Sequence, residues 1–93
     1  MKAIERTNRF KRDYRREKSG TLGKKLDQLL IEVLELLAAD RPLPHRCFDH
    51  PLSGDWSGFR DCHVRPDLLL IYEKPDASTL RLVRLGSHNE LGF

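Results

Sequence analysis

Apolar residues recur with a helical period in the first half of the chain and with a strand period in the second half. After Thr21, leucine and valine residues follow one another at intervals of three and four positions, the spacing of one face of an amphipathic helix. Pro42 disfavours helical backbone at Arg41, so this helix is expected to end there. Such a stripe is more often part of a core than a partner-binding zipper. Its members are Leu22, Leu26, Leu29, Leu30, Val33, Leu36 and Leu37.

A shorter helix is expected in front of it. Thr7 or Asn8 can cap a helix that runs to about Lys18, and Ser19-Gly20 then breaks it. The two helices would form a helical hairpin. Residues 2–6, KAIER, can form a first strand, but the pattern does not say where this strand enters a sheet.

From residue 58 onward the chain alternates with the period of a strand. One face of residues 58–65 would carry Phe59, Asp61, His63 and Arg65, and the other Arg60, Cys62 and Val64. The run LLLIY at 68–72 is typical of a strand buried on both faces, and TLRLVRL at 79–85 indicates a third strand. Turns are expected at 65–67 and 74–77, where a proline precedes an aspartate.

These elements predict one α+β domain over residues 1–93. The helical hairpin is expected to cover one face of a mainly antiparallel sheet, which the three-strand meander completes. Residues 41–57 form a long loop with three prolines and no periodicity. Loops of this length in compact domains are often functional.

Charge is distributed unevenly along the chain. Residues 1–25 contain ten lysines and arginines against three acidic residues, a net charge of +7, whereas the whole chain carries +3. Lys11, Arg15 and Lys18 share one face of the expected first helix. Such a block favours phosphate backbones or an acidic protein partner, and a solvated basic helix is the alternative.

Other features restrict the class of protein. No run of about 18 apolar residues is present, so no membrane span is expected. The N-terminus lacks the apolar stretch of a secretory signal, so a cytoplasmic location is expected. Cys47 and Cys62 have the spacing of neither a disulfide framework nor a zinc motif, and we interpret both as small apolar residues.

Polar residues concentrate at 49–67, DHPLSGDWSGFRDCHVRPD, which holds four aspartates, two histidines and the only tryptophan. Strand alternation places Asp61 and His63 on one face. Cys62 and Val64 are better suited to the face under the helices.

Three segments could bring acid and base groups to one end of the sheet. His50 lies in the loop, Asp67 follows the next turn, and His88 follows the third strand. Histidine can accept or donate a proton near neutral pH, and arginine suits phosphate oxygens, so this convergence fits metal-free cleavage of RNA. A metal site built from the same histidines lacks HxH or HxxxH spacing, and the only tryptophan can simply order the loop.

The stretch DHPLSGDWSGFRDCHVRPDLLLIY, followed by RLGSH, resembles the YafQ type of toxin within the RelE/ParE superfamily of bacterial toxin–antitoxin modules. The resemblance runs over nearly the whole chain. It implies an endonuclease that cuts mRNA in the ribosomal A site without a metal or other cofactor. It also implies a cognate antitoxin as partner, with operator DNA contacted only through that antitoxin.

The resemblance assigns the catalytic residues to motifs. They are His50 of DHPL, Asp61 and His63 of RDxHV, Asp67 of the PD turn and His88 of RxGxH. His50, His63 or Asp67 would be the general base, His88 the general acid or a phosphate ligand, and Asp61 would position a histidine. The expected RNA or ribosome contacts are Lys11, Arg15, Lys18, Arg60, Arg65, Arg84 and Phe93.

The tail departs from the family pattern. The family usually has Leu-Phe shortly after the last histidine, with a phenylalanine that helps hold the substrate, whereas this chain reads Leu91-Gly92-Phe93. Phe93 can still reach the substrate because terminal residues are mobile. Codon preference or activity would be the property affected.

Three other functions remain open from the sequence. A ParE-like toxin would share the fold and act on a topoisomerase, but it would not need the four groups His50, His63, Asp67 and His88 together. A ribosome- or RNA-binding module without catalysis would not depend on the histidines. A metalloenzyme would lose activity in a chelator.

Overall fold

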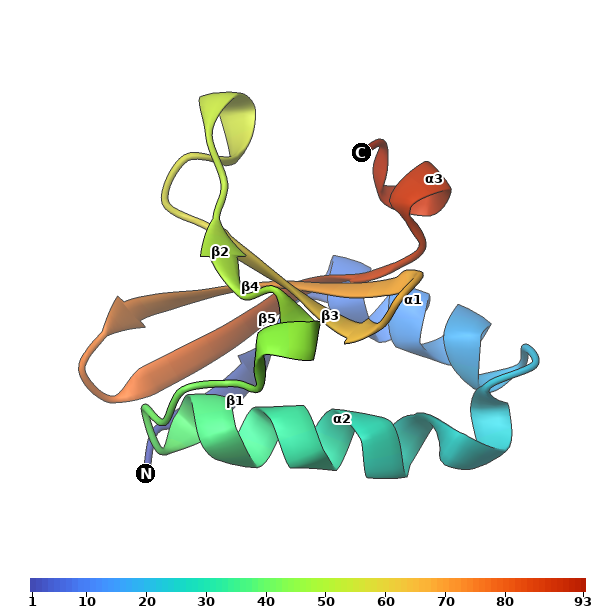
Figure 1. Ribbon diagram of the computed structural model, residues 1–93, viewed down its shortest axis with the longest axis horizontal. Helices are drawn as coiled ribbons and strands as arrows, with labels where there is room; N and C mark the ends of the chain where they lie inside the picture. The colour runs from blue at the N-terminus through green and yellow to red at the C-terminus, as the bar shows by residue number, and fades with distance from the viewer.

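A five-stranded sheet organises the computed structural model, which describes residues 1–93 (Figure 1). Its strands lie in the order β1-β5-β4-β3-β2. Two helices lie under one face, and this arrangement confirms the α+β fold predicted from the sequence. The elements are β1 (Ala3–Arg6), α1 (Asn8–Lys18), α2 (Gly23–Ala38), the 3-10 turn η1 (His45–Cys47), β2 (His50–Pro51), the 3-10 turn η2 (Gly54–Trp56), β3 (Arg60–Arg65), β4 (Leu68–Asp76), β5 (Thr79–Gly86) and α3 (His88–Leu91).

The first strand lies parallel to the last one. Ala3 is opposite Thr79 and Arg6 is opposite Leu82, so the first and last strands of the chain are neighbours in the sheet. Thr7 continues this link: its hydroxyl donates to the Val83 carbonyl at 2.9 Å and accepts from the Phe10 N–H at 3.1 Å. Thr7, one of the two caps predicted from the sequence, therefore caps α1 and fixes the helix against β5.

The larger part of the core lies between the sheet and the helical hairpin. Figure 1 shows α2 running beneath the sheet. The leucine stripe of α2 faces β3, β4 and β5, which explains its spacing, and Cys62 and Val64 lie on this face as predicted. The buried residues here are Phe10, Leu26, Leu30, Val33, Leu37, Ala38, Cys62, Leu68, Leu70, Tyr72, Leu80, Leu82 and Leu85.

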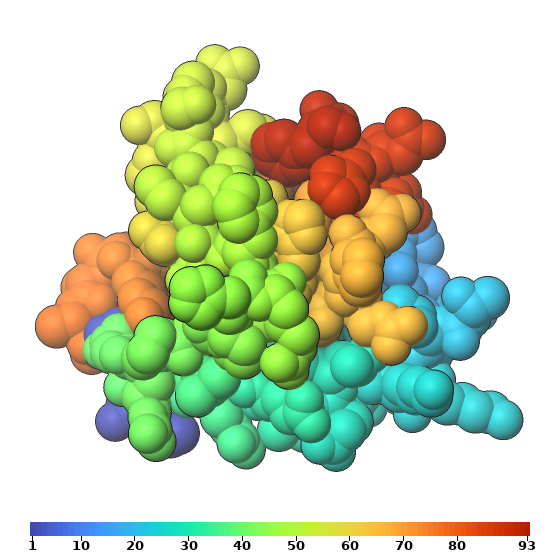
Figure 2. Space-filling view, in the orientation of Figure 1, coloured from blue at the N-terminus to red at the C-terminus, as the bar shows by residue number.

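The opposite face carries a smaller apolar cluster. Leu69 and Ile71 of β4 are buried there together with Leu91 of α3. The segment from β2 to η2 and the helix α3 both rise from this face, and the space-filling view shows them side by side (Figures 1 and 2). Residues far apart in the chain therefore meet above β3 and β4.

Several boundaries differ from the expected ones. The second helix begins at Gly23 rather than Thr21. The chain turns so tightly between α1 and α2 that a Cβ at Gly23 would lie 2.1 Å from the Lys18 carbonyl oxygen, so this position requires glycine. The turn expected at 74–77 lies further along the chain, at Ala77 and Ser78. β4 continues to Asp76, with a register shift after Glu73 that accommodates the intervening proline. The loop at 41–57 contains η1, β2 and η2.

A buried carboxylate joins α1 to β5. Asp13 accepts from Arg84 Nε at 2.7 Å, from Arg16 Nη1 at 2.9 Å and from the Leu85 N–H at 3.0 Å. Burial alone would raise the pKa of Asp13, but the hydrogen bonds from Arg84 and Leu85 outweigh it, so the pKa lies below its ordinary value. None of the helices is both long and apolar enough for a membrane crossing.

Candidate active site

Asp49 holds the arm that carries His50. Its Oδ1 accepts from the Tyr72 hydroxyl at 2.6 Å and from Arg60 Nε at 3.2 Å. Burial, followed by the hydrogen bond to Asp49, raises the pKa of Tyr72, so the hydroxyl stays protonated. With Asp49 fixed, β2 pairs with β3 and sets His50 opposite Asp61.

The backbone orients the His50 ring. His50 Nδ1 lies 2.7 Å from the Phe48 carbonyl oxygen, and because a carbonyl only accepts, Nδ1 must carry the hydrogen. The neutral ring then has its lone pair on Nε2, which lies 3.9 Å from Asp61 Oδ2. A carboxylate therefore lies near the ring nitrogen that can accept a proton, where its charge favours the protonated ring.

Asp61 is a buried carboxyl group that lacks hydrogen bonds to replace those it would make with water. It is 4% exposed, and its Oδ1 has no hydrogen-bond partner. Burial raises the pKa of Asp61, because a charged carboxylate loses its hydration there, while the positive charge of His50 or His63 lowers it. The carboxylate is therefore stabilised most when a neighbouring histidine is protonated.

His88 and Asp67 form a second pair. Asp67 Oδ1 accepts from His88 Nδ1 at 2.7 Å and from the His88 N–H at 3.2 Å. These bonds lower the pKa of Asp67 and leave Nε2 of His88 free to exchange a proton. The ring centroids of His63 and His88 lie 5.4 Å apart, so His63 stands beside this pair.

The short helix α3 is fixed from two sides. Ser87 caps it and exchanges hydrogen bonds with Glu90 in a capping box. Glu90 also pairs with Arg16 of α1 at 2.9 Å, and Arg16 Nη2 donates to the Leu85 carbonyl at 2.8 Å. The position of His88 thus depends on a contact with α1.

The five predicted catalytic residues lie on one face, as two histidine–carboxylate pairs with His63 between the loop and α3. Phe48 contacts both His50 and His63, with centroid distances of 4.6 and 5.9 Å. Among the other predicted residues, Phe93 lies beside Trp56 at the edge of the same face, with the ring centroids 6.0 Å apart and the rings tilted.

The predicted basic contacts do not gather at this site. Lys11, Arg15 and Lys18 are exposed on α1, under the opposite face of the sheet, and Lys18 pairs with Asp27 at 2.9 Å. Arg65 is exposed at the end of β3. Two predicted contacts are engaged in structural pairs instead, Arg60 with Asp49 and Arg84 with Asp13.

Five residues that hold the site in place were not identified from the sequence. They are Asp49, Tyr72, Asp13, Arg16 and Glu90. Asp49 could have been found from its place in the DHPL motif. Asp13 is an acid among the arginines of α1, and this context is the only signal that marks it.

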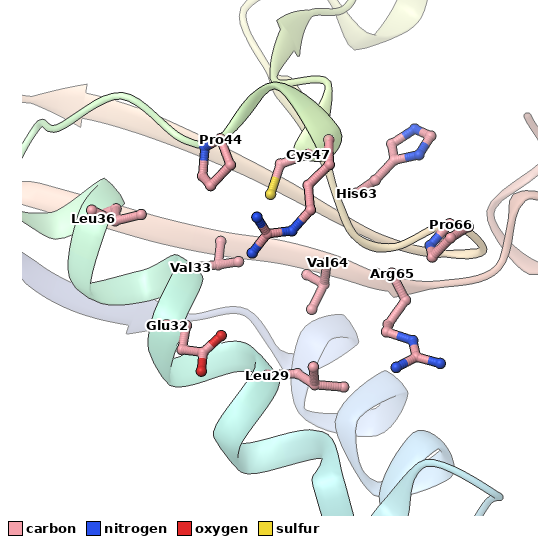
Figure 3. A pocket seen from close by; sticks show the side chains of 11 residues that line it. Leu29, Glu32, Val33, Leu36, Pro44, Cys47, His63, Val64, Arg65 and Pro66 are labelled. Carbon is pink, nitrogen blue, oxygen red and sulfur yellow. The ribbon is translucent and has the colours of Figure 1, made fainter.

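A separate cavity of about 340 Å³ lies between α2 and β3 (Figure 3). Leu29, Val33 and Leu36 form its wall on α2, and Val64 lies across from them. His63 reaches only its rim, and the His63 ring points away from α2. No three histidine, cysteine, aspartate or glutamate side chains come together in a group that could hold a metal ion.

Comparison with known proteins gives consistent matches to one family of toxins. Residues 2–92 match the family model for YafQ, the bacterial toxin of a type II toxin–antitoxin system. The mRNA interferase toxin YafQ of Escherichia coli K12 is 43% identical over 68 residues, covering 73% of each chain. A copper-bound mutant toxin from Helicobacter pylori superposes with a TM-score of 0.85 at 35% identity, covering 98% of this chain and 99% of that one. YafQ in the E. coli DinJ–YafQ complex gives a TM-score of 0.78 at 33% identity, with 98% of both chains covered.

Proposed function

Since the chain belongs to the YafQ family of type II toxin–antitoxin toxins, we propose that it is an mRNA interferase that cuts mRNA in the ribosomal A site. The observation that carries this proposal is the presence of two histidine–carboxylate pairs on one open face, His50 with Asp61 and His88 with Asp67. Cleavage of RNA beside its own 2′-hydroxyl needs one base and one acid, and the two pairs supply them.

His50 is the general base in this proposal. Its Nδ1–H is held by the Phe48 carbonyl, so the Nε2 lone pair can take the proton of the 2′-hydroxyl. The 2′-oxygen attacks the adjacent phosphorus and forms a 2′,3′-cyclic phosphate as the bond to the 5′-oxygen breaks. Asp61 then faces the imidazolium and stabilises it.

His88 is the general acid. Its Nδ1–H is bound to Asp67, so its protonated Nε2 can donate to the leaving 5′-oxygen. Asp67 is engaged in orienting His88 and is therefore a weaker candidate for the base than His50. Positioned proton transfer is worth roughly 10²–10⁴ in rate for each group.

His63 lies where the reacting phosphate would be held. It stands 5.4 Å from His88 by ring centroids and also contacts Phe48. In its charged form it would stabilise the negative charge that develops on the phosphate oxygens.

The basic helix α1 points away from this face, which suits a second, sequence-independent contact. Lys11 and Arg15 are exposed there without a carboxylate partner. We assign this surface to the phosphate backbone of ribosomal RNA, a contact that weakens steeply with salt. An antitoxin with an acidic segment would compete for the same charge, and operator DNA would be contacted through that antitoxin.

The test is primer extension on a defined mRNA with translating ribosomes and purified protein. We expect cleavage at A-site codons, on ribosomes only, that is lost in His50→Ala and His88→Ala. Asn89→Ala is the matched control, because Asn89 is exposed on α3 beside His88. Persistent cleavage in both histidine variants would refute the assignment of acid and base.

A chelator distinguishes the metalloenzyme alternative, which the metal-bound state of the H. pylori relatives keeps relevant. The proposed mechanism predicts the same rate with and without EDTA. Intact mRNA together with inhibited DNA supercoiling would instead favour a ParE-like action on a topoisomerase.

A further inference from the structure

Phe48 combines two features that fold stability does not explain. Its side chain is 64% exposed, and its backbone is left-handed, with φ 45° and ψ 50°. Glycine or asparagine adopts this conformation readily, whereas a bulky residue is disfavoured there. A large apolar ring is thus kept in an unfavourable conformation, in contact with water.

The residues around Phe48 hold it in this position. The Phe48 N–H donates to the His45 carbonyl at 3.0 Å, and the preceding Cys47 is buried. The following residue, Asp49, is anchored by the Tyr72 hydroxyl at 2.6 Å. The backbone is therefore held on both sides of Phe48, and these contacts maintain its left-handed conformation.

The ring stands at the edge of the candidate active site. Its centroid lies 4.6 Å from that of His50 and 5.9 Å from that of His63. An open cavity of about 310 Å³ adjoins it, formed with Pro42, Leu43 and Asp49 among others. A planar group bound in this cavity could stack on the Phe48 ring, which itself contacts the proposed base His50.

A second exposed aromatic stands across the same face. Phe93 is 46% exposed and packs against Trp56, which in turn contacts Phe59. Exposed aromatic rings that flank basic or histidine groups are the usual means of binding unpaired bases, because every base has a π-face.

We propose that Phe48 stacks on a nucleobase adjoining the scissile phosphodiester, so that it binds and selects single-stranded RNA. The placement of the scissile bond rests on the proposed function, whereas the stacking contact itself does not. Stacking on one aromatic ring changes affinity by about 5- to 150-fold.

The test compares three variants. Phe48→Asn removes the ring and suits the left-handed backbone, Phe48→Leu keeps an apolar side chain without a π-face, and Phe48→Trp enlarges the ring. Binding is measured with RNA whose 2′-O-methyl groups prevent cleavage. One format is a free tetranucleotide, and the other is an mRNA on programmed ribosomes that carries the modified codon in the A site. We expect the asparagine and leucine variants to bind about 5- to 150-fold more weakly and the tryptophan variant to bind at least as tightly.

Two further readouts separate stacking from a structural role. A stacked base shows upfield ring-current shifts of its protons in NMR spectra of the wild type, and these shifts should vanish in Phe48→Leu. The melting temperature of Phe48→Asn should equal or exceed that of the wild type, because the substitution relieves the backbone. A residue retained only for folding would give the opposite change.

The outcomes also distinguish this inference from the proposed function. If the wild type cleaves no mRNA but Phe48→Asn still weakens RNA binding, the cleavage proposal fails and the stacking contact stands. Equal affinity of wild type and Phe48→Asn, in both formats, would overturn the stacking contact. The stacking contact would also be overturned if Phe48→Asn lowered kcat alone and displaced the pH profile. That result would make Phe48 a positioning residue for His50.

Discussion

Removal of the Asp13 carboxylate should be among the most destabilising single changes in this protein. Asp13 is 4% exposed and binds two guanidinium groups and a backbone N–H. Asp13→Ala leaves Arg84, whose side chain is only 16% exposed, without its carboxylate, and leaves the Leu85 N–H without an acceptor. Breaking one side of a buried ion pair costs about 3–5 kcal/mol.

That loss is large for a chain of this size. Domains are stable by about 5–15 kcal/mol in total, so the variant would retain a fraction of its stability or unfold. A small domain loses roughly 4–8 °C of Tm for each kcal/mol, which places the expected decrease on the order of 20 °C. Circular dichroism during heating measures the Tm. Circular dichroism during urea unfolding measures the midpoint and the slope, which together give the free energy of unfolding.

The matched control is Asp27→Ala. Asp27 also binds two side chains, the Tyr14 hydroxyl and Lys18, but it is exposed on α2. Its removal should leave the free energy of unfolding nearly unchanged, because exposed pairs contribute little. Similar losses in the two variants would refute the reasoning, since burial would then not set the cost. Asp13→Leu combined with Arg84→Met should recover part of the loss, because it removes both buried charges.

The pH dependence provides an independent check. The pKa of Asp13 is lower in the folded protein than its ordinary value of 3.8. Its contribution is therefore present above pH 3.8 and is lost as the pH falls through the folded value. The stability difference between wild type and Asp13→Ala should accordingly be constant near neutral pH and shrink in acid.

Three further predictions concern the active-site face. Asp61→Asn should raise the free energy of unfolding near neutral pH by on the order of 1 kcal/mol, since burial raises the pKa of Asp61. The gain should vanish below pH 3.8, where the carboxyl is protonated in both the folded and the unfolded state. A-site cleavage by this variant should be slower. Glu90→Gln keeps the α3 cap but loses the pair with Arg16, so unfolding assays should show a loss of about 0.2–1 kcal/mol while kcat falls several-fold. His88→Ala should raise the pKa of Asp67 toward its ordinary value, but not fully, because the backbone N–H of residue 88 still donates to the carboxylate. Carboxylate NMR measures the change, and an unchanged pKa would contradict the side-chain pairing.

Most of the fold could be predicted because its elements have long, clear periods. The leucine stripe of α2 and the alternation of β3 each indicate their buried face, and both faces are confirmed. β1 could not be placed, because a four-residue strand has no readable period and pairs with residues 76 positions away. The end of β4 was misplaced because proline and aspartate usually indicate a turn, whereas here a register shift absorbs them.

The candidate site could be predicted as a set of residues but not as a set of contacts. Motifs named the histidines and aspartates, and alternation placed Asp61 and His63 on one face. The sequence does not show whether Asp67 pairs with His88, as in the structure, or acts as a base on its own. Arg60 and Arg84 show the same limit, because a charged residue in a strand gives no sign of whether it faces solvent or a carboxylate.

The place of β5 between β1 and β4 has a consequence for biosynthesis. Leu80, Leu82 and Leu85 of β5 belong to the main core, so the helical hairpin lacks part of its packing surface until this strand has left the ribosome. Contacts between such distant segments form late and slowly, and the emerging chain exposes its apolar stripe in the meantime. His88 follows β5 directly, so a nascent chain that still lacks β5 has no assembled site. The order of synthesis thus delays activity until β5 has joined the sheet and the fold is complete.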